Sequence, residues 1–146
     1  MEIRQTTPKE AQEALAADPA ATYLDVRTEA EFEQGHPPGA LNVPVMLFGP
    51  SGGPAKLNER FVDVVRGHID TNRTLFIGCQ SGMRSQRAAE ILAGAGFENV
   101  INVAGGFGGT RDRAGNVITA GWRDSGLPVE TGQPAERCYR DLAAKL

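Results

Sequence analysis

The sequence is poor in cysteine, histidine and long apolar runs, and each shortage excludes a class of protein. Its 146 residues include two cysteines, Cys79 and Cys138, and two histidines. These are too few and too widely spaced for a disulfide framework or a structural zinc site. No apolar run approaches the roughly 18 residues that a membrane-spanning helix needs, and the N-terminus, MEIRQTTPKEAQE, is too polar for a signal peptide. We therefore expect a cytoplasmic protein that contacts no membrane and holds no metal or other cofactor.

A concentration of positive charge is also absent. The formal net charge is −3, from 15 basic and 18 acidic side chains, and the basic residues form no block. The charge therefore gives no support to nucleic-acid binding. A chain of this length fits one domain, which can bury a substantial core without disulfides or a metal.

Strand patterns alternate with helix patterns along the chain. Short apolar runs predict strands at residues 3–5, 22–26, 40–43, 74–78 and 100–103. Capping residues and helical spacing predict helices capped by Thr7 and Thr28, and further helices over 57–68 and 85–95. This alternation predicts an α/β fold, in which a central parallel sheet of about five strands carries helices on both faces.

Three segments lie outside this alternation. Residues 48–56 are rich in glycine and proline, which predicts a loop. Residues 107–119 are glycine-rich and charged, and they predict a loop or an irregular hairpin that borders the site entrance. Residues 131–146 predict a tail or short helix that packs on a domain of residues 1–130. Cys138 lies on the apolar stripe of this tail, which favours packing over a reactive role.

The segment with the most chemical content is CQSGMRS, residues 79–85. The strand before it delivers Cys79 to the carboxyl end of the sheet, where α/β proteins bind ligands, and a helix begins just beyond. A tight turn, to which Gly82 gives freedom, can aim backbone N–H groups and the helix N-terminus at an anion. Arg84 adds positive charge, with no acidic residue close to it in sequence. We therefore expect Cys79 to react as a thiolate.

This loop resembles the active-site loop of single-domain rhodaneses, a family of sulfurtransferases. Four further segments resemble the family in the same order: DVR at 25–27, GHPPGALNVP at 35–44, GF…V…GG from 96 to 106, and W…GLP from 122 to 128. The resemblance implies the rhodanese fold and a persulfide on Cys79. That cysteine would take a sulfane sulfur from a small anionic donor such as thiosulfate and pass it to cyanide or to a thiol, free or carried by a protein.

The resemblance also assigns the site residues. Cys79 takes the catalytic role, and the rest of the loop takes donor binding: Gln80, Ser81, Gly82, Met83, Arg84 and Ser85. Because the sulfite that leaves thiosulfate is a weak base, the reaction asks for no general acid. The backbone N–H groups of the loop would stabilise the anionic persulfide.

Two other functions stay open. Phosphatases and arsenate reductases use related cysteine loops to bind tetrahedral oxyanions, but four residues separate Cys79 from Arg84 here, one fewer than in those relatives. The third hypothesis is a sulfur relay or binding module that acts only with a protein partner. The cysteine argues against a purely binding role, because inactive members of the family commonly lack it.

Several residues near the predicted site have plainer interpretations. Asp25 and Arg27 are expected to fix the loops through an ion pair or hydrogen bonds, with Glu31 as a candidate partner of Arg27. His36 is expected to be a structural histidine, and His68 to be solvated. Two bulky residues are expected either to line the mouth of the site or to pack in the ordinary way: Met83 and Phe107.

Overall fold

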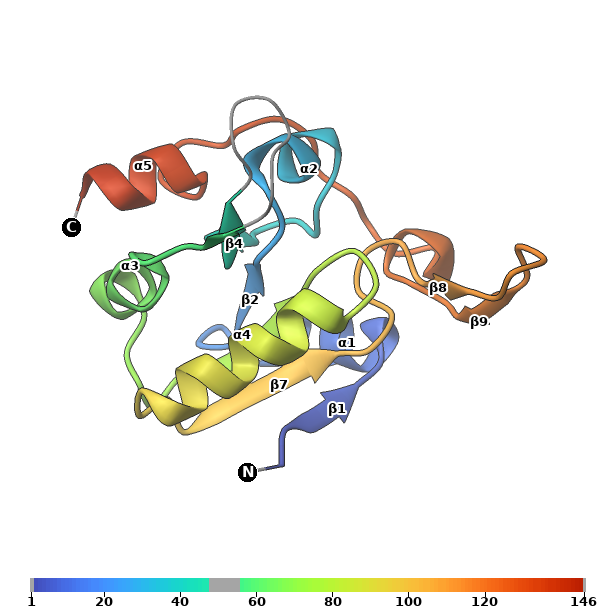
Figure 1. The fold of residues 1–146 in the computed structure, drawn as a ribbon, viewed down its shortest axis with the longest axis horizontal. Coiled ribbons are helices and arrows are strands. Elements are labelled where there is room, and N and C mark those ends of the chain that lie inside the picture. Colours follow the sequence, from blue (N-terminus) through green and yellow to red (C-terminus); the bar gives the residue numbers. More distant parts are fainter. Residues whose placement is uncertain (1, 48–55, 146) are drawn as a thin grey trace.

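The computed structural model describes residues 2–47 and 56–145, so most of the loop predicted over 48–56 lies outside the described residues. Its centre is a parallel sheet of five strands in the order β1-β7-β6-β2-β3 (Figure 1). The strands are β1 (Arg4–Thr6), β2 (Thr22–Asp25), β3 (Leu41–Asn42), β6 (Thr74–Gly78) and β7 (Asn99–Val103). The helices are α1 (Pro8–Ala17), α2 (Glu29–Gln34), α3 (Phe61–His68), α4 (Met83–Gly94) and α5 (Tyr139–Ala144). The prediction of a parallel α/β sheet of about five strands is confirmed.

Alternate residues of the central strands enter two separate hydrophobic clusters, one on each face of the sheet. Leu75 and Ile77 of β6 join side chains of α3, α4 and α5. Phe76, between them, faces the other way and joins α1, α2 and Trp122. Figure 1 shows α4 in front of the sheet and α1 behind it. Because successive side chains of a strand point to opposite faces, this pattern requires helices on both sides.

Helix α3 is shorter than predicted. The helical spacing suggested a start at Leu57, whereas the helix begins at Phe61. Leu57 belongs instead to β5 (Lys56–Leu57), which pairs antiparallel with β4 (Met46–Leu47). Pairing with a strand that lies earlier in the chain therefore overrides the local helical pattern at this position.

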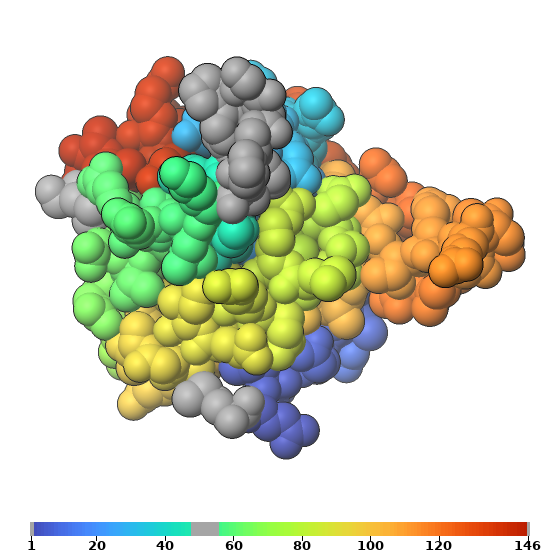
Figure 2. Space-filling model, in the orientation of Figure 1, coloured from blue at the N-terminus to red at the C-terminus, as the bar shows by residue number. Residues whose placement is uncertain are grey.

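The charged stretch after β7 forms a hairpin. Its strands are β8 (Thr110–Arg111) and β9 (Val117–Thr119), and a short 3-10 helix, η1 (Arg123–Ser125), follows them. Figures 1 and 2 show this hairpin projecting from the body of the molecule. Trp122, directly after the hairpin, is fully buried, and its indole N–H donates to the Pro128 carbonyl at 2.7 Å. The indole thus anchors the base of the projection in the core.

The C-terminal tail runs back across α2 and β3. The backbone N–H of Gly132 donates to Glu33, and that of Asn42 in β3 donates to Arg137, at 2.8 and 2.9 Å. The tail ends in α5, which lies against α3. Within the described residues, no helix has the length and apolar character that crossing a membrane requires.

Candidate functional site

Cys79 lies where β6 ends and the turn into α4 begins. Its side chain is buried, with 1% of the residue exposed. The backbone N–H of Gly82 donates to Sγ at 3.0 Å, and the Ser85 hydroxyl lies 3.4 Å from Sγ. Gly82 has φ +110°, a left-handed conformation that favours glycine, and it stands directly before the first residue of α4. The sequence therefore predicted both the position of Cys79 and the turn that curls back over its sulfur.

The glycine-rich segment after β7 holds the backbone of the Cys79 turn from the other side. The N–H of Phe107 donates to the Cys79 carbonyl at 2.7 Å, and the N–H of Gly108 donates to the Gln80 carbonyl at 2.9 Å. A Cβ on Gly106 would collide with the Cys79 carbonyl oxygen. Glycine is therefore needed at that position, because it lets the two backbones approach this closely.

The sequence suggested an Arg84 guanidinium without an acidic partner, but the structure shows one. Its guanidinium donates two hydrogen bonds to the Glu31 carboxylate of α2, at 2.8 and 2.9 Å. These bonds raise the pKa of Arg84. Burial alone would raise the pKa of Glu31, but the bonds from Arg84 and from Thr28 lower it to about 2. The opposing acidic residue comes from 53 positions away, so inspection of the neighbouring sequence missed it.

Arg27 also has a different partner from the one predicted. The expected bond to Glu31 does not form, and Arg27 instead makes a paired contact with Asp25, with Nη2 to Oδ2 at 2.7 Å. Burial alone would lower the pKa of Arg27, but the Asp25 carboxylate outweighs it and raises that pKa. Both residues are buried, which agrees with their predicted structural role. Arg27 further donates to the Gln80 side chain at 3.3 Å and to the Gly35 carbonyl at 2.6 Å.

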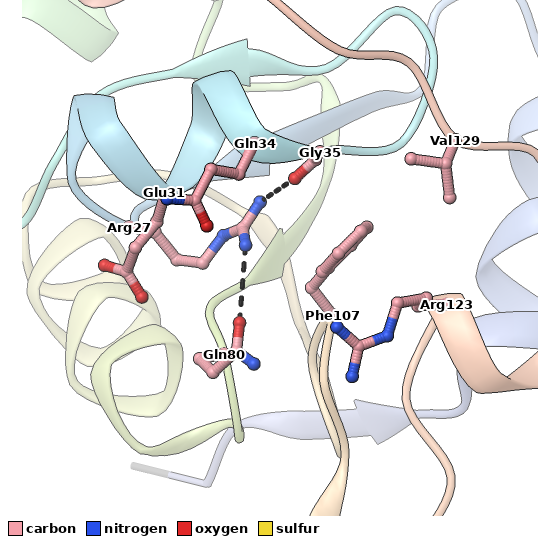
Figure 3. A pocket seen from close by; sticks show the side chains of 8 residues that line it. All are labelled: Arg27, Glu31, Gln34, Gly35, Gln80, Phe107, Arg123 and Val129. Atoms are coloured by element: carbon pink, nitrogen blue, oxygen red, sulfur yellow. Dashed lines mark hydrogen bonds between the residues drawn. The ribbon is translucent and has the colours of Figure 1, made fainter.

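A cavity of about 440 Å³ opens beside this arginine (Figure 3). Its walls are Arg27, Glu31, Gln34, Gly35, Gln80, Phe107, Arg123 and Val129. The Phe107 ring lies between two guanidiniums, that of Arg27 at 4.6 Å and that of Arg123 at 5.9 Å from its centre. Gln80, the residue after Cys79, connects this cavity to the turn that holds the sulfur. Phe107 therefore lines a cavity that adjoins the Cys79 turn through Gln80.

The other residues singled out in the sequence fall in varied places. Met83 is 81% exposed and does not line the cavity. His36 is buried and bonded to the Phe32 carbonyl and the Glu130 carboxylate, as a structural histidine should be. His68 is half-buried, and its ring lies 2.7 Å from the Leu142 carbonyl, so it is less solvated than predicted. Two remaining residues are partly or fully buried: Ser81 and Cys138.

One neighbour of the turn was missed altogether. The Ser85 hydroxyl donates to Oδ1 of Asn102 at 2.5 Å, and Asn102, in β7, is 4% exposed. An asparagine among the apolar residues of a predicted buried strand could have drawn attention to it. In the part of the chain that the structure describes, no cluster of three or more His, Cys, Asp or Glu side chains is placed to hold a metal ion.

Comparisons with known proteins give one consistent result. The model of the rhodanese-like domain family matches residues 7–112. Thiosulfate sulfurtransferase 16 of Arabidopsis thaliana, a chloroplastic protein, is 40% identical over 108 residues, which are 74% of this chain and 78% of that one. Thiosulfate sulfurtransferase 18 of the same plant is 36% identical, over 75% of this chain and 71% of its own. The crystal structure of Rv0390 from M. tuberculosis is 32% identical, with a TM-score of 0.74 over 90% of this chain and 100% of that one.

Proposed function

The chain belongs to the rhodanese-like domain family, and we propose that it is a sulfurtransferase that carries sulfur as a persulfide on Cys79. The curated relatives named as thiosulfate sulfurtransferases support thiosulfate, or a small anion like it, as the donor. The acceptor in this proposal is a thiol or cyanide. Gln80 to Ser85 form the cradle that holds the transferred sulfur.

One observation carries the proposal: the Cys79 sulfur accepts the Gly82 N–H at 3.0 Å, directly before the N-terminus of α4. A donor on Sγ favours its anionic form over its protonated form. The positive end of the helix dipole adds to this effect within the first turn. The site can therefore hold a thiolate, and afterwards a persulfide anion, without a metal or a basic side chain in contact with the sulfur.

The first half-reaction loads the enzyme. The Cys79 thiolate attacks the outer sulfur of thiosulfate, and a new sulfur–sulfur bond forms while the bond to sulfite breaks. Sulfite leaves with the electron pair of the broken bond, and Cys79 becomes a persulfide. Because sulfite is a weak base, it needs no proton to leave, which agrees with the bound, structural position of His36.

The second half-reaction returns the enzyme to its starting state. An acceptor thiolate attacks the outer sulfur of the persulfide, and the Cys79 thiolate leaves with the electron pair. The acceptor departs as a persulfide, or as thiocyanate when cyanide is used. The cavity beside Gln80 gives the acceptor a place next to the turn, with apolar surface on Phe107 and a cation on Arg123.

Intact-mass measurement after incubation with thiosulfate tests the proposal directly. We expect the wild type to gain one sulfur atom, cyanide to remove it, and the Cys79→Ser variant to gain nothing. The matched control is Cys138→Ser, which removes the other cysteine and should load as the wild type does. Loading of Cys79→Ser, or failure of the wild type to load with any sulfane donor, would refute the assignment.

Phosphatase activity gives a second discrimination. A phosphoryl group brings three oxygens that all need donors, and the four residues between Cys79 and Arg84 form a small ring of backbone. We expect negligible hydrolysis of p-nitrophenyl phosphate by the wild type. Strong hydrolysis together with an absence of persulfide would favour the oxyanion-hydrolase alternative.

A further inference from the structure

A chain of polar side chains leads from the Cys79 sulfur through two buried residues, Ser85 and Asn102, to Gln5 of β1. Ser85 of α4 lies 3.4 Å from Sγ and donates to Asn102 Oδ1 at 2.5 Å. Asn102 in turn donates from Nδ2 to Gln5 Oε1 at 2.8 Å and to the Gly82 carbonyl at 3.4 Å. Ser85 is 0% exposed and Asn102 is 4% exposed. The sulfur transfer described above assigns no role to Asn102 or Gln5.

Counting hydrogens fixes the direction of each bond. The Gly82 carbonyl can only accept, so the Asn102 amide must turn its NH₂ toward Gly82 and Gln5 and its oxygen toward Ser85. A serine hydroxyl has a single hydrogen. When that hydrogen is given to Asn102, the Ser85 oxygen can only accept from Cys79, which suits a protonated thiol. When Cys79 is a thiolate, the hydrogen must leave Asn102 to reach the sulfur.

We propose that Asn102 is a positioning residue that competes with the Cys79 thiolate for the one hydrogen of the Ser85 hydroxyl. This inference rests on the proposed function of Cys79. The thiolate is then less stabilised than it would be if the Ser85 hydroxyl were free to donate to it. It is correspondingly more nucleophilic, because nucleophilicity falls as a thiolate is stabilised.

Sulfur loading relieves the competition. Once a persulfide forms, the negative charge lies on the outer sulfur. Sγ is then a weaker acceptor for the hydrogen of the Ser85 hydroxyl. The hydroxyl then returns to Asn102, whose buried oxygen would otherwise lack a donor. Loading is favoured by this return, so the Asn102 amide helps to drive sulfur onto the enzyme.

Other charged groups near Cys79 stay in place when Asn102 is changed. Tyr23 and Asp25 approach from β2, and Arg27 follows that strand. Arg84 approaches from α4 and is held by Glu31. Asn102 of β7 is neutral, and it is linked to the Cys79 sulfur only by way of the Ser85 hydroxyl. A variant at Asn102 therefore alters the hydroxyl and leaves these charges unchanged.

The test is the pH profile of alkylation of Cys79 by iodoacetamide, read by peptide mass mapping. This reaction involves no sulfur transfer, so its outcome is independent of whether thiosulfate loads the enzyme. We expect Asn102→Leu to shift the profile to lower pH by about half to one unit, because the freed hydroxyl can donate to the thiolate. The limiting rate at high pH should fall about two- to threefold. A merely structural role would not produce these two opposite changes together.

The same substitution in a Ser85→Ala background supplies the control. Because Ser85→Ala has no hydroxyl at this position, adding Asn102→Leu to it should leave the pH profile of Cys79 alkylation unchanged. An equal shift in both backgrounds, or no shift when Ser85 is present, would overturn the proposal. If Asn102→Leu fails to fold, Asn102→Asp keeps the shape and a stronger acceptor. It should then move the profile to higher pH, by more when Ser85 is present than in Ser85→Ala.

Discussion

The ion pair between Glu31 and Arg84 lies at the edge of the Cys79 turn, and Glu31 also forms part of the cavity wall. We predict that Glu31→Gln increases the affinity for thiosulfate. The substitution removes one negative charge from the cavity and releases the Arg84 guanidinium from a carboxylate. A glutamine at this position can still accept the Thr28 N–H that Glu31 accepts at 3.2 Å, so the start of α2 is preserved.

The size of the effect follows from the charges. A unit charge acting on a dianion at about 8 Å in a water-like dielectric changes the free energy by about 1 kcal/mol. That is roughly a fivefold change in a dissociation constant. The same substitution weakens an ion pair whose side chains are 25% and 33% exposed. We therefore expect a loss of about 1 kcal/mol in the free energy of unfolding, near the upper end of values for surface pairs.

Single-turnover release of sulfite, followed against thiosulfate concentration, separates binding from chemistry. Glu31→Gln should lower the apparent Kd for thiosulfate about fivefold and leave the limiting rate unchanged, because neither Glu31 nor Arg84 is bonded to Sγ. Raising the ionic strength should diminish the difference. The matched control is Glu33→Gln, an exposed position of the same helix with the same change in charge. An equal change in both variants, or weaker binding in Glu31→Gln, would refute the argument.

Three further predictions concern other parts of the molecule. Cys138→Ala should keep nearly the full rate of sulfur transfer and lower the melting temperature, because only buried packing is lost. A large loss of activity at an unchanged melting temperature would indicate a resolving cysteine. Arg123→Gln should slow transfer to carboxylated thiols severalfold relative to neutral thiols and leave loading by thiosulfate nearly unchanged, with Arg113→Gln as the control. Equal rates with all thiols would remove Arg123 from acceptor binding. Because Glu31 and Glu130 titrate at about 2 in the folded protein against 4.5 ordinarily, the unfolded chain binds more protons as pH falls between these values. The free energy of unfolding, measured with denaturant, should therefore decrease over that range, and less so in Glu130→Gln.

Local patterns in the sequence were sufficient for the central sheet and for the place of the nucleophile. The apolar run of β6 and the turn at Gly82 are both encoded within a dozen residues, and they fix Cys79 at the carboxyl end of a strand before a helix. Two family segments far apart in the sequence, around Arg27 and around Gly106, then meet at the same turn. The sequence did not predict that meeting.

Local sequence patterns did not predict the partners of charged and polar side chains. Arg84 reaches Glu31 across 53 positions, and Ser85 reaches Asn102 across 17. Which carboxylate an arginine selects depends on the distance between packed helices, and this distance emerges only from the whole fold. Arg27 was assigned to Glu31 for a different reason: its true partner, Asp25, is only two positions away, and local sequence alone does not decide between two nearby carboxylates.

The return of the tail across β3 has a consequence for how the chain behaves as a fragment. β3 is an edge strand, and an open strand edge is a template for pairing between chains. Here the Asn42 N–H is already occupied by the Arg137 carbonyl, and the tail is fastened on the way by a bridge between His36 and Glu130. A chain cut after Glu130 would uncover that edge, and we expect it to self-associate at concentrations where the full chain stays monodisperse. We therefore expect the smallest fragment that stays monomeric to extend beyond residue 112, where the family match ends.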